Sequence, residues 1–334
     1  MTTVNTIGGP VDTADLGRTY MHEHIFVFNP DIEQNWPQEW GNTDDRVADA
    51  VRQLRELAQQ GVKTMVECTA PGNGRNVPLM QQVARQVPEL NIIVSTGLYT
   101  FRDLPFTFFA RGPALKRYGL DEQPDPIIEH CVRDITEGIA GTGGVKAGNL
   151  KCAIDEFGLT EDVERVMRAM AAVHHRTGVP ITVHTHADSK TGLEVKRVIC
   201  DEEGVDPRRV VLGHSGDTTS LDHLRELADH GFWLGFDRFG VNYPPALGLP
   251  TYESRNKTLI EMCELGYADH IVLSHDVNCY IDWFDEKLRH TMAPDWNYLH
   301  LGNRVLPDIR KGGVTDEQIN TMLVDNPRRI FDGT

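Results

Sequence analysis

The chain has 334 residues, 40% of them hydrophobic, which is enough to bury a large core. Its 33 Lys and Arg against 49 Asp and Glu give a formal net charge of −16, which argues against a nucleic-acid partner. No apolar run is long enough to cross a membrane, residues 1–17 lack the features of a secretory leader, and the six cysteines form no C-x-x-C motif. We therefore predict a cytoplasmic protein with reduced thiols and no membrane partner.

Strand-like apolar runs alternate with helix-like segments along the chain. The runs that predict strands are residues 19–28, 62–69, 90–99, 147–154, 179–186, 209–216, 232–239 and 270–276. Between the first two runs, Val47, Val51, Leu54 and Leu57 have helical spacing. A later helix is predicted to end at Gly178.

Eight β-then-α units predict parallel strands joined by right-handed crossovers. We therefore expect a single domain over residues 1–334 with the (β/α)8 TIM-barrel fold. The alternative is an open, doubly wound sheet, which should carry a G-x-G-x-x-G turn after the first strand. No such turn follows the run at 19–28.

The first predicted strand contains an H-x-H motif, formed by His22 and His24. Side chains alternate along a strand, so both imidazoles should point the same way, about 6–7 Å apart. They could bind one metal ion. A hydrogen-bonded pair of histidines near a strand end is the competing interpretation.

Metal-capable side chains also fall at the ends of other predicted strands. These residues are Lys151, His184, His186, His214 and Asp276. In a (β/α)8 barrel the carboxyl ends of the strands form the active-site face, so these groups should converge there. Histidine and carboxylate ligands without thiolate suit a divalent cation such as zinc, cobalt, manganese or iron.

Several of these assignments have alternatives. Spacing alone leaves open which of His184 and His186 lies nearer a metal. His275 and Asp276 should point to opposite faces, and only the one facing the barrel interior would be functional. A buried Lys151 is costly unless it is paired or neutralised, so it is either modified or reaches out to solvent.

The local strings narrow the assignment further. The segments "MHEHIFVF", "NLKCA", "TGLEVKRVI", "VLGHSGDT", "GFDRFG", "LSHDVNCYIDW" and "LVDNPRRIF" resemble those of the phosphotriesterase family in the amidohydrolase superfamily. They are most similar to its phosphotriesterase-like lactonases of the actinobacterial type. The resemblance runs from about Gly8 to Phe331.

This resemblance implies a centre of two divalent metal ions, with zinc foremost and cobalt, manganese or iron as alternatives. One metal would be held by His22, His24 and Asp276. The other would be held by His184 and His214. Lys151 would bridge them as N6-carboxylysine, together with a hydroxide.

The resemblance also implies an activity, namely the opening of lactones, including N-acyl-homoserine lactones, by attack of the bridging hydroxide. Asp276 would move the proton, and Tyr99 would orient the substrate. Arg238 would hydrogen-bond at the site, or form a structural salt bridge. Trp283 would line an acyl-chain pocket, or simply pack. The implied side activity is hydrolysis of organophosphate triesters, and the implied assembly is a homodimer.

Two enzymatic alternatives remain open at this point. One is a dedicated phosphotriesterase, or aryldialkylphosphatase. The other is an amidohydrolase that acts on a different carboxylic ester or amide.

Overall fold

The computed structural model describes residues 2–120, 124–242 and 248–334. Its centre is one sheet of eight strands, in the order β11-β10-β9-β8-β7-β6-β5-β3, and each neighbouring pair is parallel. The strands are β3 (Thr19–Glu23), β5 (Thr64–Glu67), β6 (Asn91–Gly97), β7 (Asn149–Ala153), β8 (Ile181–His184), β9 (Val210–Gly213), β10 (Trp233–Phe236) and β11 (Ile271–Leu273).

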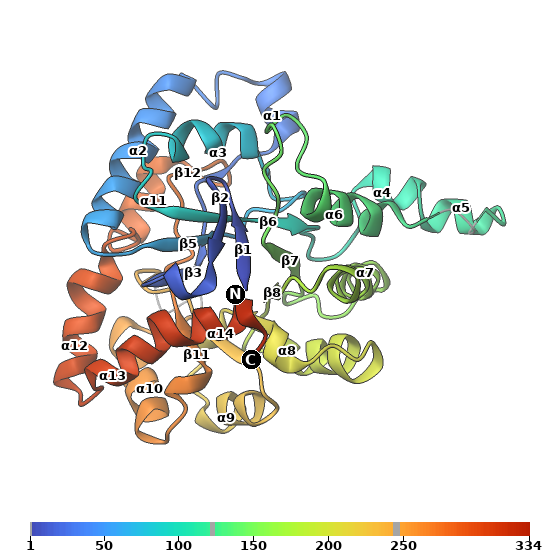
Figure 1. Ribbon diagram of the computed structural model, residues 1–334. Helices are drawn as coiled ribbons and strands as arrows, with labels where there is room; N and C mark the ends of the chain where they lie inside the picture. Colours follow the sequence, from blue (N-terminus) through green and yellow to red (C-terminus); the bar gives the residue numbers. More distant parts are fainter. Residues whose placement is uncertain (1, 121–123, 243–247) are drawn as a thin grey trace.

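Helices lie outside the strands (Figure 1). Those that follow barrel strands in the chain are α2 (Thr43–Gln59), α3 (Val77–Ala84), α6 (Pro126–Thr136), α7 (Glu161–Thr177), α8 (Thr191–Val195), α9 (Leu221–Asp229) and α10 (Tyr252–Glu264). The alternation confirms the predicted (β/α)8 barrel. None of the described helices has the length and apolar character needed to cross a bilayer.

The predicted helical features are present in these elements. Val47, Val51, Leu54 and Leu57 are all buried on one side of α2. Helix α7 ends at Thr177 and is capped, as predicted, by Gly178. The φ of Gly178 is 72°, in the left-handed region that glycine adopts without strain.

Smaller elements complete the chain. The strands β1 (Thr3–Thr6) and β2 (Gly9–Asp12) form an antiparallel hairpin, and β4 (Phe26–Val27) pairs with β12 (Tyr280–Ile281). The remaining helices are α1 (Pro30–Asn35), α4 (Phe106–Ala110), α5 (Pro113–Arg117), α11 (Glu286–Met292), α12 (Leu306–Lys311), α13 (Asp316–Asn320) and α14 (Asn326–Asp332). Helices α4 and α5 project from the body of the molecule, and the two termini lie near each other (Figure 1).

The strands are shorter than the apolar runs that predicted them. The run at 19–28 divides into β3 and β4, and the run at 270–276 forms a strand only at Ile271–Leu273. In the second case the chain turns away, and Asp276 has a left-handed φ of 55°. The apolar runs therefore continue past the strand ends into the loops that form the site.

Alternate strand residues bury two different sets of apolar side chains. One set packs between the strands and the helices and includes Leu150 and Cys152 of β7. The other set includes Met21, Val66 and Val272. Since side chains alternate along a strand, Lys151 points to the opposite side from Leu150 and Cys152, towards the barrel interior.

Within the described parts of the chain, β3 and β11, the first and last barrel strands, form no ladder of paired residues, and other hydrogen bonds join them. The backbone N–H of Asp276 donates to the His22 carbonyl at 3.0 Å, and that of His24 donates to the Val277 carbonyl at 2.9 Å. The His22 N–H donates to Ser274 Oγ at 2.9 Å. These bonds close the barrel beside the H-x-H motif.

Candidate metal centre

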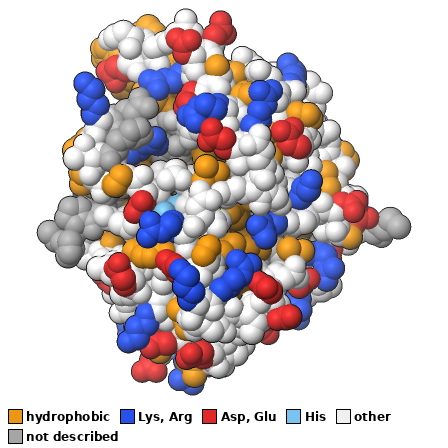
Figure 2. Space-filling model, turned by 90° about the vertical axis from the view of Figure 1, so that its left-hand side faces the viewer, with side chains coloured by type: hydrophobic (Ala, Val, Ile, Leu, Met, Phe, Trp, Pro, Cys, Tyr) orange, Lys and Arg blue, Asp and Glu red, His pale blue; other side chains and the backbone are white. Residues whose placement is uncertain are grey.

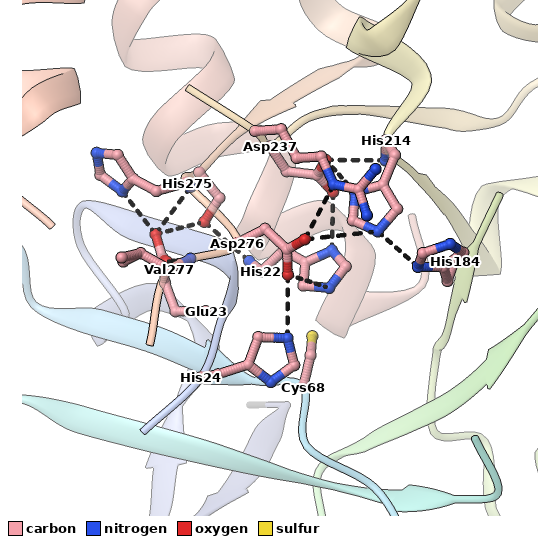
Figure 3. Close-up of polar contacts among 12 residues, drawn as sticks. His22, Glu23, His24, Cys68, His184, His214, Asp237, His275, Asp276 and Val277 are labelled. Carbon is pink, nitrogen blue, oxygen red and sulfur yellow. Dashed lines mark hydrogen bonds and ion pairs between the residues drawn. The ribbon is translucent and has the colours of Figure 1, made fainter. Parts of the chain in front are cut away.

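The structure gathers the side chains that the sequence singled out as metal ligands (Figure 3). His24 Nε2 lies 3.0 Å from Asp276 Oδ1, and His22 Nε2 lies 3.5 Å from the same oxygen. His214 Nε2 lies 2.9 Å from His184 Nδ1. They come from both halves of the chain, and the parallel barrel brings the strand ends together.

Lys151 lies between these groups and is fully buried. Its Nζ is 2.9 Å from His22 Nε2, and within the described parts of the chain it forms no ion pair with a carboxylate. A buried ammonium without an anionic partner is costly. Because Lys151 is fully buried, the solvent-reaching alternative is wrong.

Two of the imidazoles are held from behind by one carboxylate. His22 Nδ1 lies 2.8 Å from Asp237 Oδ2, and His214 Nδ1 lies 2.9 Å from Asp237 Oδ1. An ionised carboxylate only accepts hydrogen bonds, so both Nδ1 atoms carry the proton. The Nε2 atoms of His22 and His214 are therefore unprotonated.

The other two imidazoles are fixed in a similar way. Thr69 donates its hydroxyl hydrogen to Glu67 at 2.6 Å, so it accepts from His24 Nδ1 at 2.7 Å. His184 Nε2 donates to the carboxylate of Asp155. The unprotonated nitrogens of these two rings are thus Nε2 of His24 and Nδ1 of His184.

In every case the unprotonated nitrogen is the one that faces the centre. Two lone pairs face each other across the 2.9 Å between His184 and His214, and His24 presents its lone pair to the Asp276 carboxylate. Such contacts are repulsive unless a cation lies among them. Histidine ligands in metal sites typically donate their other ring N–H to a carboxylate or similar acceptor, so the donor set fits divalent metal ions.

Burial keeps these groups in metal-binding form. It lowers the pKa of His184 to about 4, and it also lowers the pKa of His22 and His214 below the ordinary value. Burial alone would raise the pKa of Asp276, but electrostatic interactions with His214, His22 and Arg238 outweigh burial and hold it well below its usual range. Neutral imidazoles and an ionised carboxylate are the forms that bind metals.

Comparison with known proteins agrees with this geometry. The sequence profile described as "Phosphotriesterase family" matches residues 2–331. The chain belongs to the phosphotriesterase family. Membership in this family makes the chain a hydrolase. Its clusters of His and Asp side chains could hold metal ions.

Relatives in this family match the chain over almost its whole length. It is 50% identical to "Phosphotriesterase homology protein" of Mycobacterium tuberculosis over 332 residues, which are 99% of this chain and 98% of that one. It is 38% identical to "Aryldialkylphosphatase" of Saccharolobus solfataricus, with 96% of each chain covered. A solved phosphotriesterase structure from M. tuberculosis matches with a TM-score of 0.93 at 51% identity and covers 99% of this chain and 98% of that one.

The structure answers two questions that the sequence left open, namely which of His184 and His186, and which of His275 and Asp276, faces the centre. His275 turns away from the centre, donating from Nδ1 to Glu23 at 2.8 Å and accepting from the Leu301 N–H at 2.9 Å (Figure 3). Asp276 is therefore the residue that faces the centre. His186 lies beyond the end of β8 and bonds Ser189 Oγ at 2.7 Å, so His184 is the histidine at the centre.

Arg238 connects the centre to a second buried acid. Its Nε donates to Asp276 Oδ2 at 3.0 Å and its Nη1 donates to Asp217 Oδ2 at 2.8 Å. Asp217 is held in turn by the buried Arg255, whose Nη2 donates at 2.8 Å. The hydrogen-bonding and salt-bridge interpretations of Arg238 are thus both correct, and the chain of ion pairs fixes the orientation of Asp276.

A cavity of about 250 Å³ opens beside the centre. Its polar lining includes His24, Tyr99 and Arg238, and apolar side chains of Val27, Phe101, Leu249, Ile281 and Phe284 line the rest. Trp283 also lines it and is 56% exposed. On the face shown in Figure 2, a histidine is visible in a hollow beside charged side chains and a band of hydrophobic ones.

Tyr99 joins the cavity to the centre. Its hydroxyl lies 3.1 Å from His184 Nδ1, and burial raises its pKa well above the ordinary value. The hydroxyl is therefore protonated and can donate a hydrogen bond to a bound substrate. Tyr99, Arg238 and Trp283 all line the cavity, and their roles towards a substrate stay predictions.

Sequence reasoning missed the residues that hold the imidazoles from behind, which are Glu67, Thr69, Asp155 and Asp237. Asp237 directly precedes Arg238, so a carboxylate beside a strand end was a usable signal. Glu67, the last residue of β5, and Asp155, two residues past β7, gave the same kind of signal, whereas Thr69 gave none.

Proposed function

We propose that this protein is a binuclear metal-dependent hydrolase that opens lactones, including N-acyl-homoserine lactones and other γ- and δ-lactones. Weaker hydrolysis of organophosphate triesters accompanies this activity. The observation that carries the proposal is that four unprotonated imidazole nitrogens and the Asp276 carboxylate all point to one centre around Lys151.

The residues divide into two ligand groups. His22, His24 and Asp276 would hold one metal, and His184 and His214 would hold the other. Addition of CO2 to the neutral amine of Lys151, with release of one proton, would form a carbamate anion that could ligate both metals. This modification would give Lys151 the direct anionic character that a metal ligand needs.

Two bound divalent cations would lower the pKa of a water molecule and polarise the substrate carbonyl. Asp276 accepts the proton of the attacking water and returns it to the alkoxide leaving group as the ring opens. Arg238 holds Asp276 Oδ2 at 3.0 Å and so keeps the other oxygen directed to the centre. Tyr99 donates its hydroxyl hydrogen to the substrate and orients the ring.

The cavity lining supports a ring with an apolar substituent. Polar groups occur where the cavity meets the centre, and apolar side chains such as Phe101, Ile281 and Phe284 supply surface for an acyl chain. A second candidate is a dedicated phosphotriesterase, which the name of the Saccharolobus relative favours. A third is amide hydrolysis, since a Dictyostelium discoideum relative at 26% identity is named "N-acetyltaurine hydrolase".

A substrate screen separates these candidates. The metal-loaded protein is assayed with γ-lactones, δ-lactones, N-acyl-homoserine lactones of graded chain length, paraoxon and N-acetyltaurine. We expect the highest kcat/KM with a lactone and a dependence on acyl length. A higher kcat/KM with paraoxon or N-acetyltaurine would replace the lactonase assignment.

We also propose that the protein is a cytoplasmic homodimer. The six free thiols support a reducing compartment. Phe106 and Tyr118 are each 80% exposed on the projecting region of α4 and α5, and a second copy could cover them. Light scattering of the purified protein, with Phe106→Ser and Tyr118→Ser as variants, tests the assembly.

A further inference from the structure

One buried carboxylate contacts histidines from both ligand groups. Asp237 is 1% exposed, and its Oδ2 accepts from His22 Nδ1 at 2.8 Å. Its Oδ1 accepts from both His214 Nδ1 at 2.9 Å and the His214 backbone N–H at 2.8 Å. Figure 3 shows Asp237 with the two rings.

The other acceptors behind the imidazoles each serve one ring. Thr69 accepts from His24, and Asp155 accepts from His184. Among the residues that the structure describes, Asp237 is the acceptor shared by two of these rings. In the proposed centre its two histidines belong to different groups, His22 with Asp276 and His214 with His184.

Asp237 could alternatively be a metal ligand itself, because its oxygens lie close to nitrogens of His22 and His214. The hydrogen bonds argue against this. Both carboxylate oxygens accept from Nδ1, whereas Lys151 and His184 lie at the Nε2 atoms. Oδ1 accepts a second bond from the backbone, so both oxygens of Asp237 are engaged on the side away from the centre.

We propose that Asp237 is the shared positioning residue of both metal sites. It fixes the tautomer and orientation of one histidine in each, and the inference rests on the proposed binuclear centre. Loss of this one carboxylate therefore weakens two metal sites at once, although Asp237 touches neither metal.

The chemistry of an amide makes a sharper test possible. Asparagine offers one acceptor and one donor, whereas His22 and His214 both require an acceptor. Two N–H groups already point at Oδ1, so the amide oxygen of Asp237→Asn takes that position and its NH2 faces His22 Nδ1. His22 must then protonate Nε2, the nitrogen that faces the centre.

The experiment measures cobalt(II) binding by equilibrium dialysis, together with the visible absorption spectrum of the loaded protein. Wild type, Asp237→Ala, Asp237→Asn and the matched control Asp155→Asn are compared. Asp237→Ala should weaken both equivalents, each by about 10–100-fold. Asp237→Asn should weaken only the equivalent held by His22, and Asp155→Asn only the equivalent held by His184.

Far-UV circular dichroism of the metal-free proteins checks folding, and Asp237→Asn decides the question if Asp237→Ala does not fold. Two equivalents bound with wild-type affinity by a folded Asp237 variant would overturn the inference. Loss of a single equivalent in folded Asp237→Ala would also overturn it. If the wild type binds fewer than two equivalents, the binuclear centre itself fails and the inference fails with it.

Discussion

The carboxylate of Glu23 accepts two hydrogen bonds from His275, one from its backbone N–H at 3.0 Å and one from Nδ1 at 2.8 Å. It also accepts from Ser274 Oγ at 2.9 Å and from the Val277 N–H at 3.1 Å. Glu23 thus joins the first barrel strand to the residues on both sides of Asp276. The residue between the two histidines of the H-x-H motif holds the barrel closed where the site lies.

Glu23→Gln tests this connection. The amide replaces one acceptor by a donor that faces other donors, so we expect the free energy of unfolding to fall by about 3 kcal/mol. Urea unfolding of the metal-free protein measures it. Glu156→Gln is the control, because Glu156 is exposed and the change should stay within about 0.5 kcal/mol. Equal effects of the two substitutions would contradict the role of Glu23.

Lys151→Ala removes the group on which the two proposed metal sites depend. We expect less than half of the wild-type metal content after gel filtration, together with loss of hydrolysis. Bicarbonate should also speed reconstitution of the metal-free wild type. Metal analysis by mass spectrometry gives the content, and an unchanged metal content in the variant would exclude the bridge.

Asp276→Asn separates proton transfer from metal binding. Asparagine can still offer an oxygen but cannot carry the proton, so we expect kcat to fall by about 10²–10⁴-fold. Steady-state kinetics at a saturating metal concentration measures the change. Arg238→Lys is a milder change. Lysine retains the positive charge, but it lacks the planar guanidinium through which Arg238 donates hydrogen bonds to both Asp276 and Asp217. An Asp276→Asn variant with wild-type kcat would remove Asp276 from the reaction.

The metal-free protein should lose stability in mild acid. Burial lowers the pKa of His184 in the folded chain to about 4 from the ordinary 6.5. Between those values the unfolded chain binds more protons, so the free energy of unfolding falls as the pH falls, by at most about 1.4 kcal/mol per pH unit per group. Above the ordinary value this contribution is fully present.

The effect is measured as the difference between the urea midpoints of the chelated protein at about pH 7.5 and about pH 5. The first pH lies above both pKa values of His184, and the second lies between them. His22 and His214 should add to it in the same direction. The His184→Gln variant should show a smaller difference between the two conditions. A midpoint that is constant or higher in acid would contradict the prediction.

The sequence predicted the barrel well because alternation of apolar runs and amphipathic segments is a local property. It also singled out the proposed ligands, although their places differ: His214 directly follows β9, Lys151 is the middle residue of β7, and Asp276 lies three residues past β11. The choice of His184 over His186 required the family resemblance. The structure explains that choice, because β8 ends at His184 and the chain then leaves the barrel.

The partners behind the ligands could not be predicted in the same way. Asp237 meets a histidine 215 residues earlier, and Glu23 meets one 252 residues later. Neither pairing follows from periodicity, because each depends on how the closed barrel places its first strand beside its last. The sequence therefore indicates which groups could bind a metal, and the folded chain is needed to show which nitrogen of each ring is free.

Two of the proposed ligands occupy backbone conformations that ordinary residues avoid, His214 with φ of 67° and Asp276 with φ of 55°. Such conformations cost most L-residues about 1–2 kcal/mol, and they cost Asp and His less, because these residues occur there more often than others. Replacement of either residue by glycine would relieve that cost and abolish a ligand. Directed evolution for heat resistance alone would therefore tend to erode the activity at these two positions, so both should be held constant in any library.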